Sequence, residues 1–167
     1  ILNSALKLFA SKGFDAVPTS QIAKDAGVSE GLIFRHFQNK LGLLNAIMQM
    51  GAEKASVYID AIGQIESPAE RIQAVIELPF QIDEEEYPFW RLVYSLKWQN
   101  EYYDDSLSKP LKDLLMKALD ELKYPDASSE ADLIMAYMDG FATTLLLKKE
   151  VVDKEKLLSV LRKKYIS

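Results

Sequence analysis

Apolar side chains recur every three or four residues along most of this chain, and this helical period constrains the fold more than any other feature. In the first segment Leu2, Leu6 and Phe9 follow that spacing, and Gly13 stands where a helix would end. No run of alternating β-branched residues is bounded by hairpin turns. The pattern predicts an all-α fold of about nine helices.

Capping signals predict where these helices begin. Segments 19–26 and 30–37 are short, whereas the helix that starts at Lys40 is expected to reach about Ile65. The helix that follows Ser67 is expected to bend or break near Pro79, because proline lacks the N–H that a helix interior needs. The predicted N-caps are Thr19, Ser29, Asn39, Ser67, Ser128 or Ser129, and Asp153.

Composition excludes several classes of protein. The 167 residues include no cysteine, which excludes disulfides, thiolate catalysis and zinc–thiolate sites and fits a cytoplasmic location. With a single histidine, neither a metal site nor a cofactor is predicted. No apolar run approaches the roughly 18 residues of a membrane span. A helical-bundle hydrolase or isomerase would need a nucleophile–base pair or a carboxylate–metal cluster, but no Ser–His, Cys–His or Glu-x-x-His spacing occurs, so no enzyme is predicted.

Charge is distributed unevenly along the chain. Residues 1–50 contain five basic and three acidic side chains, whereas the whole chain has a net charge of −5. A mildly basic N-terminal head joined to an acidic body indicates two roles in one chain. The same distribution excludes nonspecific polyanion binding by the whole protein.

The segment TSQIAKDAGVSEGLIFRHFQNK, residues 19–40, has the pattern of two short helices joined by a tight turn at Gly27. This spacing predicts a helix-turn-helix, in which the start of the second helix enters the major groove of DNA. The alternative is an α-hairpin packed into a helical bundle. The side chains expected to face the core are those of Ile22, Ala23, Ala26, Val28, Ile33 and Phe37.

Several residues of this segment carry groups suited to DNA. Arg35 could contact a phosphate or a guanine edge, and Lys40 could reach a backbone phosphate. Gly31 would let the backbone approach DNA closely. Glu30 repels phosphate unless it accepts a hydrogen bond from cytosine. Hydroxyls or helix N-terminal amides for phosphate are expected at Thr19, Ser20 and Ser29.

The run ALKLFASKGFDAVPTSQIAKDAGVSEGLIFRHFQNKLGLL resembles the DNA-binding domain of the TetR (tetracycline-repressor) family of transcriptional regulators. The matching features are the LF…KGF end of the first helix, TSQIAKDAGVS, FRHFQNK and the following LL. The resemblance implies a helix-turn-helix DNA-binding domain over residues 1–47 and a helical ligand-binding and dimerisation domain over residues 48–167. It also implies a homodimer that represses transcription from a double-stranded DNA operator until a small-molecule inducer binds.

The resemblance would put DNA contacts on a set of ten residues. Two of them depart from the family: Leu32 replaces a residue that is usually small or threonine, and Phe34 replaces a tyrosine whose hydroxyl contacts phosphate. These departures and Glu30 leave open a second hypothesis, a helical protein-interaction adaptor that has lost DNA binding. The implied contacts are Thr19, Ser20, Ser29, Glu30, Gly31, Leu32, Phe34, Arg35, His36 and Lys40.

Aromatic residues gather in the middle of the chain. Pockets for small apolar ligands are lined by such side chains, although aromatic residues at helical spacing also form ordinary core. The inducer is therefore expected to be a small apolar or amphipathic molecule. The predicted ligand-binding residues are Phe80, Phe89, Trp90, Tyr94, Trp98 and Tyr102.

The last two predicted helices have a second apolar surface. Two antiparallel helices of this kind can pair with their symmetry mates in a dimer, and the alternative is burial within one chain. The predicted interface residues are Leu133, Tyr137, Phe141, Leu145, Leu157 and Leu161.

Overall fold

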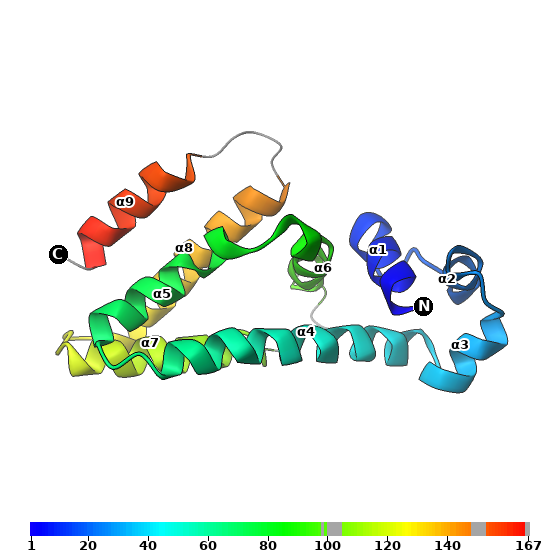
Figure 1. Ribbon diagram of the computed structural model, residues 1–167, viewed down its shortest axis with the longest axis horizontal. Coiled ribbons are helices and arrows are strands. Elements are labelled where there is room, and N and C mark those ends of the chain that lie inside the picture. The colour runs from blue at the N-terminus through cyan, green and yellow to red at the C-terminus, as the bar shows by residue number, and fades with distance from the viewer. Residues whose placement is uncertain (98, 100–104, 148–152, 166–167) are drawn as a thin grey trace. The chain divides into compact units, whose positions relative to one another are not determined.

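The computed structural model describes residues 1–97, 99, 105–147 and 153–165 (Figure 1). These residues form nine α-helices and one short 3₁₀ helix, and none of them lies in a strand. The all-α prediction is therefore confirmed. The elements are α1 (Leu2–Lys12), α2 (Thr19–Ala26), α3 (Glu30–Phe37), α4 (Lys40–Gly63), α5 (Pro68–Gln81), η1 (Glu84–Glu86), α6 (Tyr87–Leu96), α7 (Lys109–Glu121), α8 (Ala127–Leu147) and α9 (Lys154–Tyr165).

The chain forms two compact units. The N-terminal unit contains Ile1–Lys54 and Glu84–Tyr103, and the C-terminal unit contains Ala55–Asp83 and Asp104–Ser167. Helix α4 begins in the first unit and ends in the second. The N-terminal unit thus includes α6 in addition to α1–α3, and the domain division at residue 47 stays a prediction.

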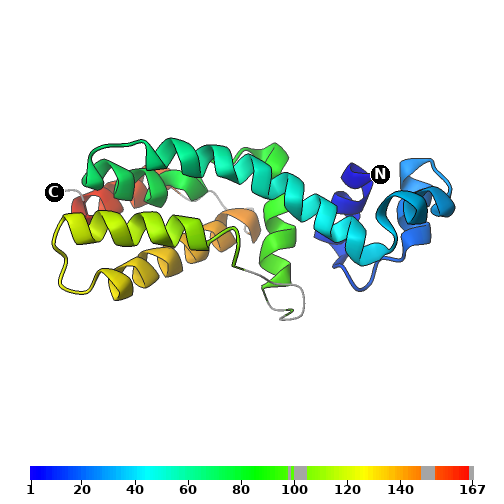
Figure 2. The same ribbon diagram turned by 90° about the horizontal axis from the view of Figure 1, so that it is seen from below.

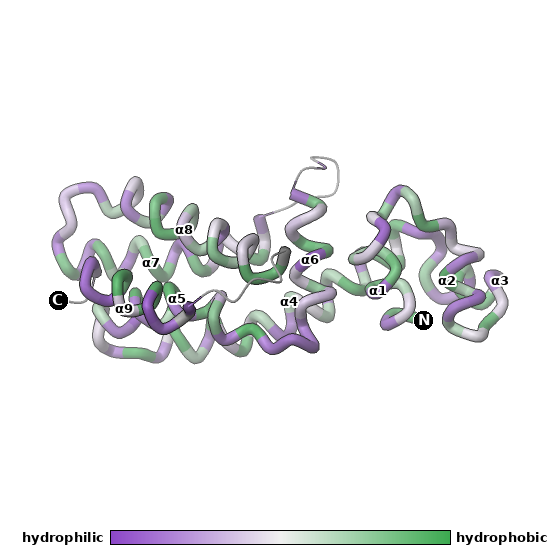
Figure 3. The backbone as a smooth tube through the Cα atoms, turned by 90° about the horizontal axis from the view of Figure 1, so that it is seen from above, coloured by the Kyte–Doolittle hydropathy of each residue, from purple (hydrophilic) through white to green (hydrophobic). Residues whose placement is uncertain are grey.

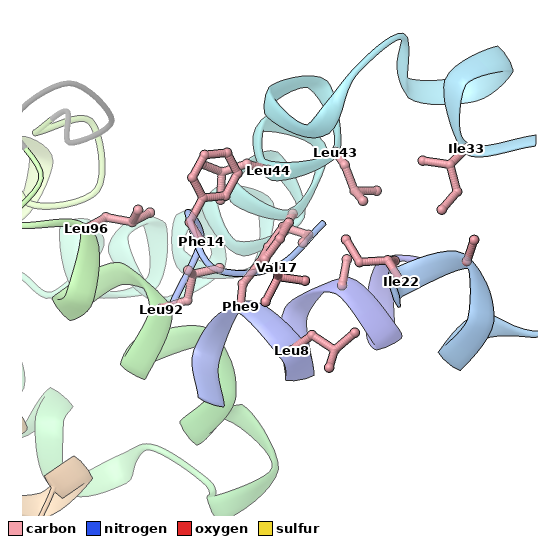
Figure 4. Packing of buried hydrophobic residues seen from close by; sticks show 13 residues of the cluster. Leu8, Phe9, Phe14, Val17, Ile22, Ile33, Leu43, Leu44, Leu92 and Leu96 are labelled. Carbon is pink, nitrogen blue, oxygen red and sulfur yellow. The ribbon is translucent and has the colours of Figure 1, made fainter. Parts of the chain in front are cut away.

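The core of the N-terminal unit holds the first three helices, the start of α4 and α6 together. Phe9, Ile22, Ile33, Leu43 and Leu92 come from five different helices, and each is 0% exposed (Figure 4). Burying one such side chain stabilises a fold by about 1.5–3 kcal/mol relative to leaving it in water. The position of α3 is therefore determined by apolar packing through Ile33.

Four predicted helix starts are confirmed by side-chain hydrogen bonds. In each case the capping oxygen accepts from a backbone N–H three residues later, which satisfies one of the free donors of the first turn. Helix α4 ends at Gly63, two residues before the predicted end. The confirmed caps are Ser29 to Leu32 at 3.3 Å, Asn39 to Gly42 at 2.8 Å, Ser67 to Glu70 at 3.4 Å and Asp153 to Lys156 at 3.0 Å.

Two predicted caps are wrong. Pro18 occupies the N-cap position of α2, so Thr19 is the first helical residue and caps nothing. Helix α8 begins at Ala127, and the Asp126 carboxylate accepts from the Ser129 N–H at 3.0 Å. Hydrogen bonds from Ser129 lower the pKa of Asp126, because they stabilise its ionised form. Helix α5 contains Pro79 and ends two residues later at Gln81, close to the proline where a bend or break was expected.

The C-terminal unit is a bundle in which α7 packs against α5 and α8, and α9 packs against α5 (Figure 2). Hydrophobic residues recur between hydrophilic ones along these helices, as amphipathic packing requires (Figure 3). The core of the bundle includes Ile72, Val75, Leu115, Leu119 and Ile134. None of the helices in the described residues combines the length and the hydropathy that crossing a bilayer requires.

A buried arginine forms an ion pair within this bundle. Arg71 of α5 is 6% exposed, and its guanidinium donates to both carboxylate oxygens of Glu121, at 3.1 and 2.6 Å. The Glu66 carbonyl oxygen accepts a further hydrogen bond from Arg71 at 3.2 Å. The pKa of Glu121 is lowered, chiefly because its ionised form accepts these bonds from Arg71. Since the Arg71 charge is buried, the fold depends on Glu121 to neutralise it.

Candidate nucleic-acid interface

The turn between α2 and α3 has the backbone conformation that a helix-turn-helix requires. Gly27 lies in the left-handed region at φ 66° and ψ 31°, where a side chain would be strained. The Val28 N–H donates to the Ala23 carbonyl oxygen at 3.0 Å and so closes the end of α2. Ser29 then caps α3. Local sequence thus determines this turn, as predicted.

Helix α3 presents one face to the core and the other to solvent. Ile33 is 0% exposed, whereas Phe34 is 45% exposed. Arg35 and His36 are also exposed, and Leu32 is partly buried. An aromatic ring, a guanidinium and an imidazole therefore share the outer side of a helix whose inner side is fixed by packing, as expected for the reading helix of a DNA-binding head.

The starts of α2 and α3 both offer backbone donors. The N–H groups of Thr19 and Ser20 in α2, and of Glu30 and Gly31 in α3, precede the first complete turn, so they have no partner within their helices. Such groups bind phosphate oxygens readily. Ser20, Ser29 and Gly31 are exposed, and a Cβ on Gly31 would meet no heavy atom within 4 Å. The space that a close approach of DNA would need is therefore open at Gly31.

Thr19 and Glu30 contact each other directly. The Thr19 hydroxyl donates to the Glu30 carboxylate oxygen Oε1 at 2.5 Å, and both side chains are partly buried. This bond joins the first residue of α2 to the first residue of α3. The hydroxyl predicted to face phosphate is thus already used within the head.

Lys40 is engaged in a similar way. Its ammonium donates to the carbonyl oxygens of Phe14 and Asp15, at 3.0 and 3.2 Å, and lies 4.5 Å from the centre of the Phe14 ring. These contacts fasten the start of α4 to the loop between α1 and α2. The sequence predicts that Lys40 contacts a phosphate, whereas in the structure its ammonium binds carbonyl oxygens of the same chain.

The junction between α3 and α4 is tightly constrained. Gln38 has a φ of 66°, which is unusual for a residue other than glycine, asparagine or aspartate. The next residue, Asn39, caps α4. A Cβ on Gly42 would overlap the carbonyl oxygen of Phe37, the last residue of α3. Only glycine fits at position 42 without a backbone shift.

The predicted ligand-binding residues are divided between the two units. Phe80 lies in the C-terminal unit beside Phe141, with ring centres 5.4 Å apart. Phe89, Trp90 and Tyr94 lie on α6 in the N-terminal unit, where Phe89 also packs against the core. Trp98 and Tyr102 lie outside the described residues. Their role as ligand contacts stays a prediction.

Phe89 has a specific partner that the sequence did not indicate. A Cβ on Gly51 would overlap the Phe89 ring, so the backbone of α4 and this ring touch directly. Gly51 is buried. Glycine in the middle of a helical pattern was the available signal, since it often marks a close approach.

The predicted dimer residues also differ in exposure. Leu133 and Tyr137 on α8 are 41% and 37% exposed, so both are accessible to a second copy of the chain. Phe141 packs against the core of the C-terminal unit, and Leu145 and Leu157 are partly buried. Leu161 is 6% exposed and belongs to that core, which matches the alternative of burial within one chain. Val160, 61% exposed on α9, was not predicted.

The sequence profile of bacterial regulatory proteins of the tetR family matches residues 1–47, the segment that contains α1–α3 and the start of α4. The N-terminal head thus matches the tetR family of regulators. The resemblance inferred from the sequence is therefore confirmed. TetR-family proteins are regulators rather than enzymes.

Two HTH-type regulators match parts of the chain. YvkB of Bacillus subtilis, an uncharacterized HTH-type transcriptional regulator, is 39% identical over 66 residues, which are 39% of this chain and 35% of YvkB. FasR of Mycolicibacterium smegmatis, an HTH-type transcriptional activator, is 28% identical over 103 residues, 61% of this chain and 45% of FasR. The chain thus spans less than half the length of either relative.

Solved structures extend the likeness to the whole fold. A TetR-like transcriptional regulator from Rhodococcus sp. RHA1 has a TM-score of 0.81 and 20% identity, covering 99% of this chain and 94% of that one. AibR in complex with isovaleryl coenzyme A and operator DNA has a TM-score of 0.78 and 18% identity, covering 96% and 92%. The helical body after the head is therefore also that of a TetR-like fold.

Proposed function

We propose that this chain is a ligand-responsive transcriptional regulator that binds an operator in double-stranded DNA as a homodimer. The observation that carries the proposal is the head: α3 is pinned inward by Ile33 and exposes Phe34, Arg35 and His36 at its outer face. Beside them lie two helix starts with free backbone donors. The family match over residues 1–47 supports the same function. An adaptor would not need this combination.

In the proposed complex the start of α3 enters the major groove. Arg35 donates to a guanine edge or a phosphate, and His36 lies next to it. The N–H groups of Ser20 and Gly31 bind phosphate oxygens. Phe34 packs on a sugar, because it lacks the hydroxyl that could bond a phosphate.

The proposed homodimer uses the exposed side of α8. Leu133 and Tyr137 are large, partly apolar side chains that are more than a third exposed in one chain. Burying them against a symmetry mate removes apolar surface from water. A two-fold dimer would also present two heads to successive major grooves about 34 Å apart on one face of DNA.

The proposed effector is a small apolar or amphipathic molecule. AibR, whose fold is similar, is known in complex with isovaleryl coenzyme A and operator DNA, and a regulator from Saccharomonospora viridis with a TM-score of 0.75 is known in complex with choline. Helix α4 has residues in both units. A ligand that shifts α4 would change the spacing of the two heads, and by linkage DNA must weaken ligand binding by the same factor.

The test is a selection of random-sequence duplex DNA on the purified chain, followed by titration of the enriched sequences at two salt concentrations. We expect an enriched near-palindrome with half-sites about one helical turn apart. Arg35→Ala should weaken binding to the selected operator, while Lys117→Ala, an exposed change on α7, should not. Nonspecific binding depends on phosphate contacts and falls steeply as the salt concentration rises, so the titration at higher salt separates it from sequence-specific binding. If no sequence is enriched at either salt concentration, the proposal is refuted and the adaptor hypothesis is favoured.

A further inference from the structure

The hydrogen bond between Thr19 and Glu30 places an unneutralised acidic side chain at the start of the reading helix. Glu30 is the first residue of α3. Among the residues the structure describes, it forms no ion pair, and its single hydrogen bond comes from Thr19. A negative charge is favourable at a helix start, but on a surface that meets DNA it opposes binding unless it meets a donor.

The same bond limits what Thr19 can do. A threonine hydroxyl has one hydrogen to donate, and that hydrogen is directed to Glu30 Oε1 at 2.5 Å. The remaining lone pairs of the hydroxyl oxygen would face the lone pairs of any phosphate oxygen. At the start of α2, phosphate binding therefore falls to the backbone N–H groups and to the exposed hydroxyl of Ser20.

The bond also leaves one oxygen of Glu30 free in a defined place. Within the described part of the chain, Oε2 has no hydrogen-bond partner. The side chain is partly buried and held through Oε1, so Oε2 loses little further freedom when it meets a donor. An ionised carboxylate can only accept hydrogen bonds.

We propose that Glu30 reads a cytosine in the major groove with Oε2, and that Thr19 is the residue that positions it. Cytosine presents the N4 amino donor alone in the major groove, whereas adenine has its N6 amino donor beside the N7 acceptor, guanine presents two acceptors, and thymine an acceptor and a methyl group. A fixed carboxylate oxygen therefore attracts cytosine and is repelled by guanine and thymine. The negative charge becomes a means of rejecting wrong bases rather than a loss in affinity. This inference rests on the proposed function.

A simpler role for the pair is that of a staple between α2 and α3. A structural link (a staple) and a base-reading residue (a reader) have different effects on operator affinity when they are removed. Breaking a staple shifts α3 and weakens binding to every operator variant by a similar factor. Removing a reader changes the preference at one base position in each half-site and leaves the other positions as they were.

The experiment measures the dissociation constants of single-base variants of the selected operator for the full chain and four variants. For the unchanged protein we expect cytosine to be preferred at one half-site position by roughly 5- to 100-fold. Glu30→Gln should lose this preference and favour a base with an acceptor, because the amide presents N–H groups where Oε2 was. Thr19→Val should reduce the preference several-fold, and Thr19→Ser, which keeps the hydroxyl, should retain it.

Asp25→Asn is the matched control, since it removes one negative charge from an exposed site on α2 and leaves the Thr19–Glu30 pair intact. It should keep the cytosine preference. The thermal midpoint of each variant shows that the head is folded. An operator that is selected but read identically by Glu30→Gln and the unchanged protein overturns this inference and leaves the proposed function standing. A uniform loss at all positions identifies a staple and also overturns it. If the unchanged protein selects no sequence, the proposed function fails as well.

Discussion

Gly42→Ala tests how closely the end of α3 and the start of α4 approach each other. Alanine should favour the helix by about 1 kcal/mol over glycine. Its Cβ, however, would overlap the carbonyl oxygen of Phe37, a backbone atom that cannot rotate away. Overpacking costs typically about 1–3 kcal/mol, and a backbone obstacle places this case near the upper end. We therefore expect the free energy of unfolding to fall by about 2 kcal/mol, because the clash costs about 3 kcal/mol and the higher helix propensity of alanine returns about 1 kcal/mol.

Thermal unfolding followed by circular dichroism measures this effect. For a chain of this length a loss of 2 kcal/mol lowers the midpoint by roughly 4–8 °C. Gly31→Ala is the matched control, because no heavy atom lies within 4 Å of its added Cβ and the residue is exposed. It should raise stability by about 0.5–1 kcal/mol. If Gly42→Ala melts at or above the unchanged protein while Gly31→Ala behaves as expected, the α3–α4 contact is not as close as argued.

Four other outcomes can be checked. Gly31→Ala should bind the selected operator more weakly despite its higher stability, because the methyl group fills the space proposed for DNA; equal titration curves would contradict this. Glu121→Ala should lower the urea midpoint more than Arg71→Met does, since only the former leaves a buried charge unpaired. Burial raises the pKa of Tyr165 to about 12, so stability should fall as pH rises from about 10 towards 12, and Tyr165→Phe should lose less over that range. Phe34→Tyr should tighten operator binding at low salt by supplying a hydroxyl for phosphate.

The helices were predictable because their signals are local. Helical spacing, a capping oxygen and a glycine at a helix end are all contained within a few residues, and four of the expected caps form the expected bonds. The exceptions have local causes as well. Pro18 displaced the start of α2 by one residue, and Asp126 preceded the two serines that were expected to cap α8.

Contacts between distant residues were not predictable in this way. Thr19 and Glu30 are eleven residues apart, and Lys40 lies twenty-six residues from Phe14. Thr19 and Lys40 each carry a group suited to phosphate, so residue type alone indicated DNA. Whether such a side chain binds another residue of the same chain depends on how the helices pack, and the pattern of residue types does not predict that packing.

The packing of the aromatic residues also depends on contacts between distant residues. Their concentration in the middle of the chain predicts a ligand pocket, and the described members lie in two units, with Phe80 in one and Phe89 in the other. Phe89 fills the space that the missing side chain of Gly51 leaves on α4.

A residue that packs this closely on α4 is sensitive to any movement of that helix. Gly51 and Phe89 both lie in the N-terminal unit, and α4 continues from there into the C-terminal unit. A shift of α4 along its axis would carry the Gly51 backbone out from under the ring and bring a neighbour with a Cβ into its place. Packed interfaces of this kind are bistable rather than continuously deformable. We expect the contact to favour discrete positions of α4 over a continuous range, as the proposed switch between two states of DNA affinity would require.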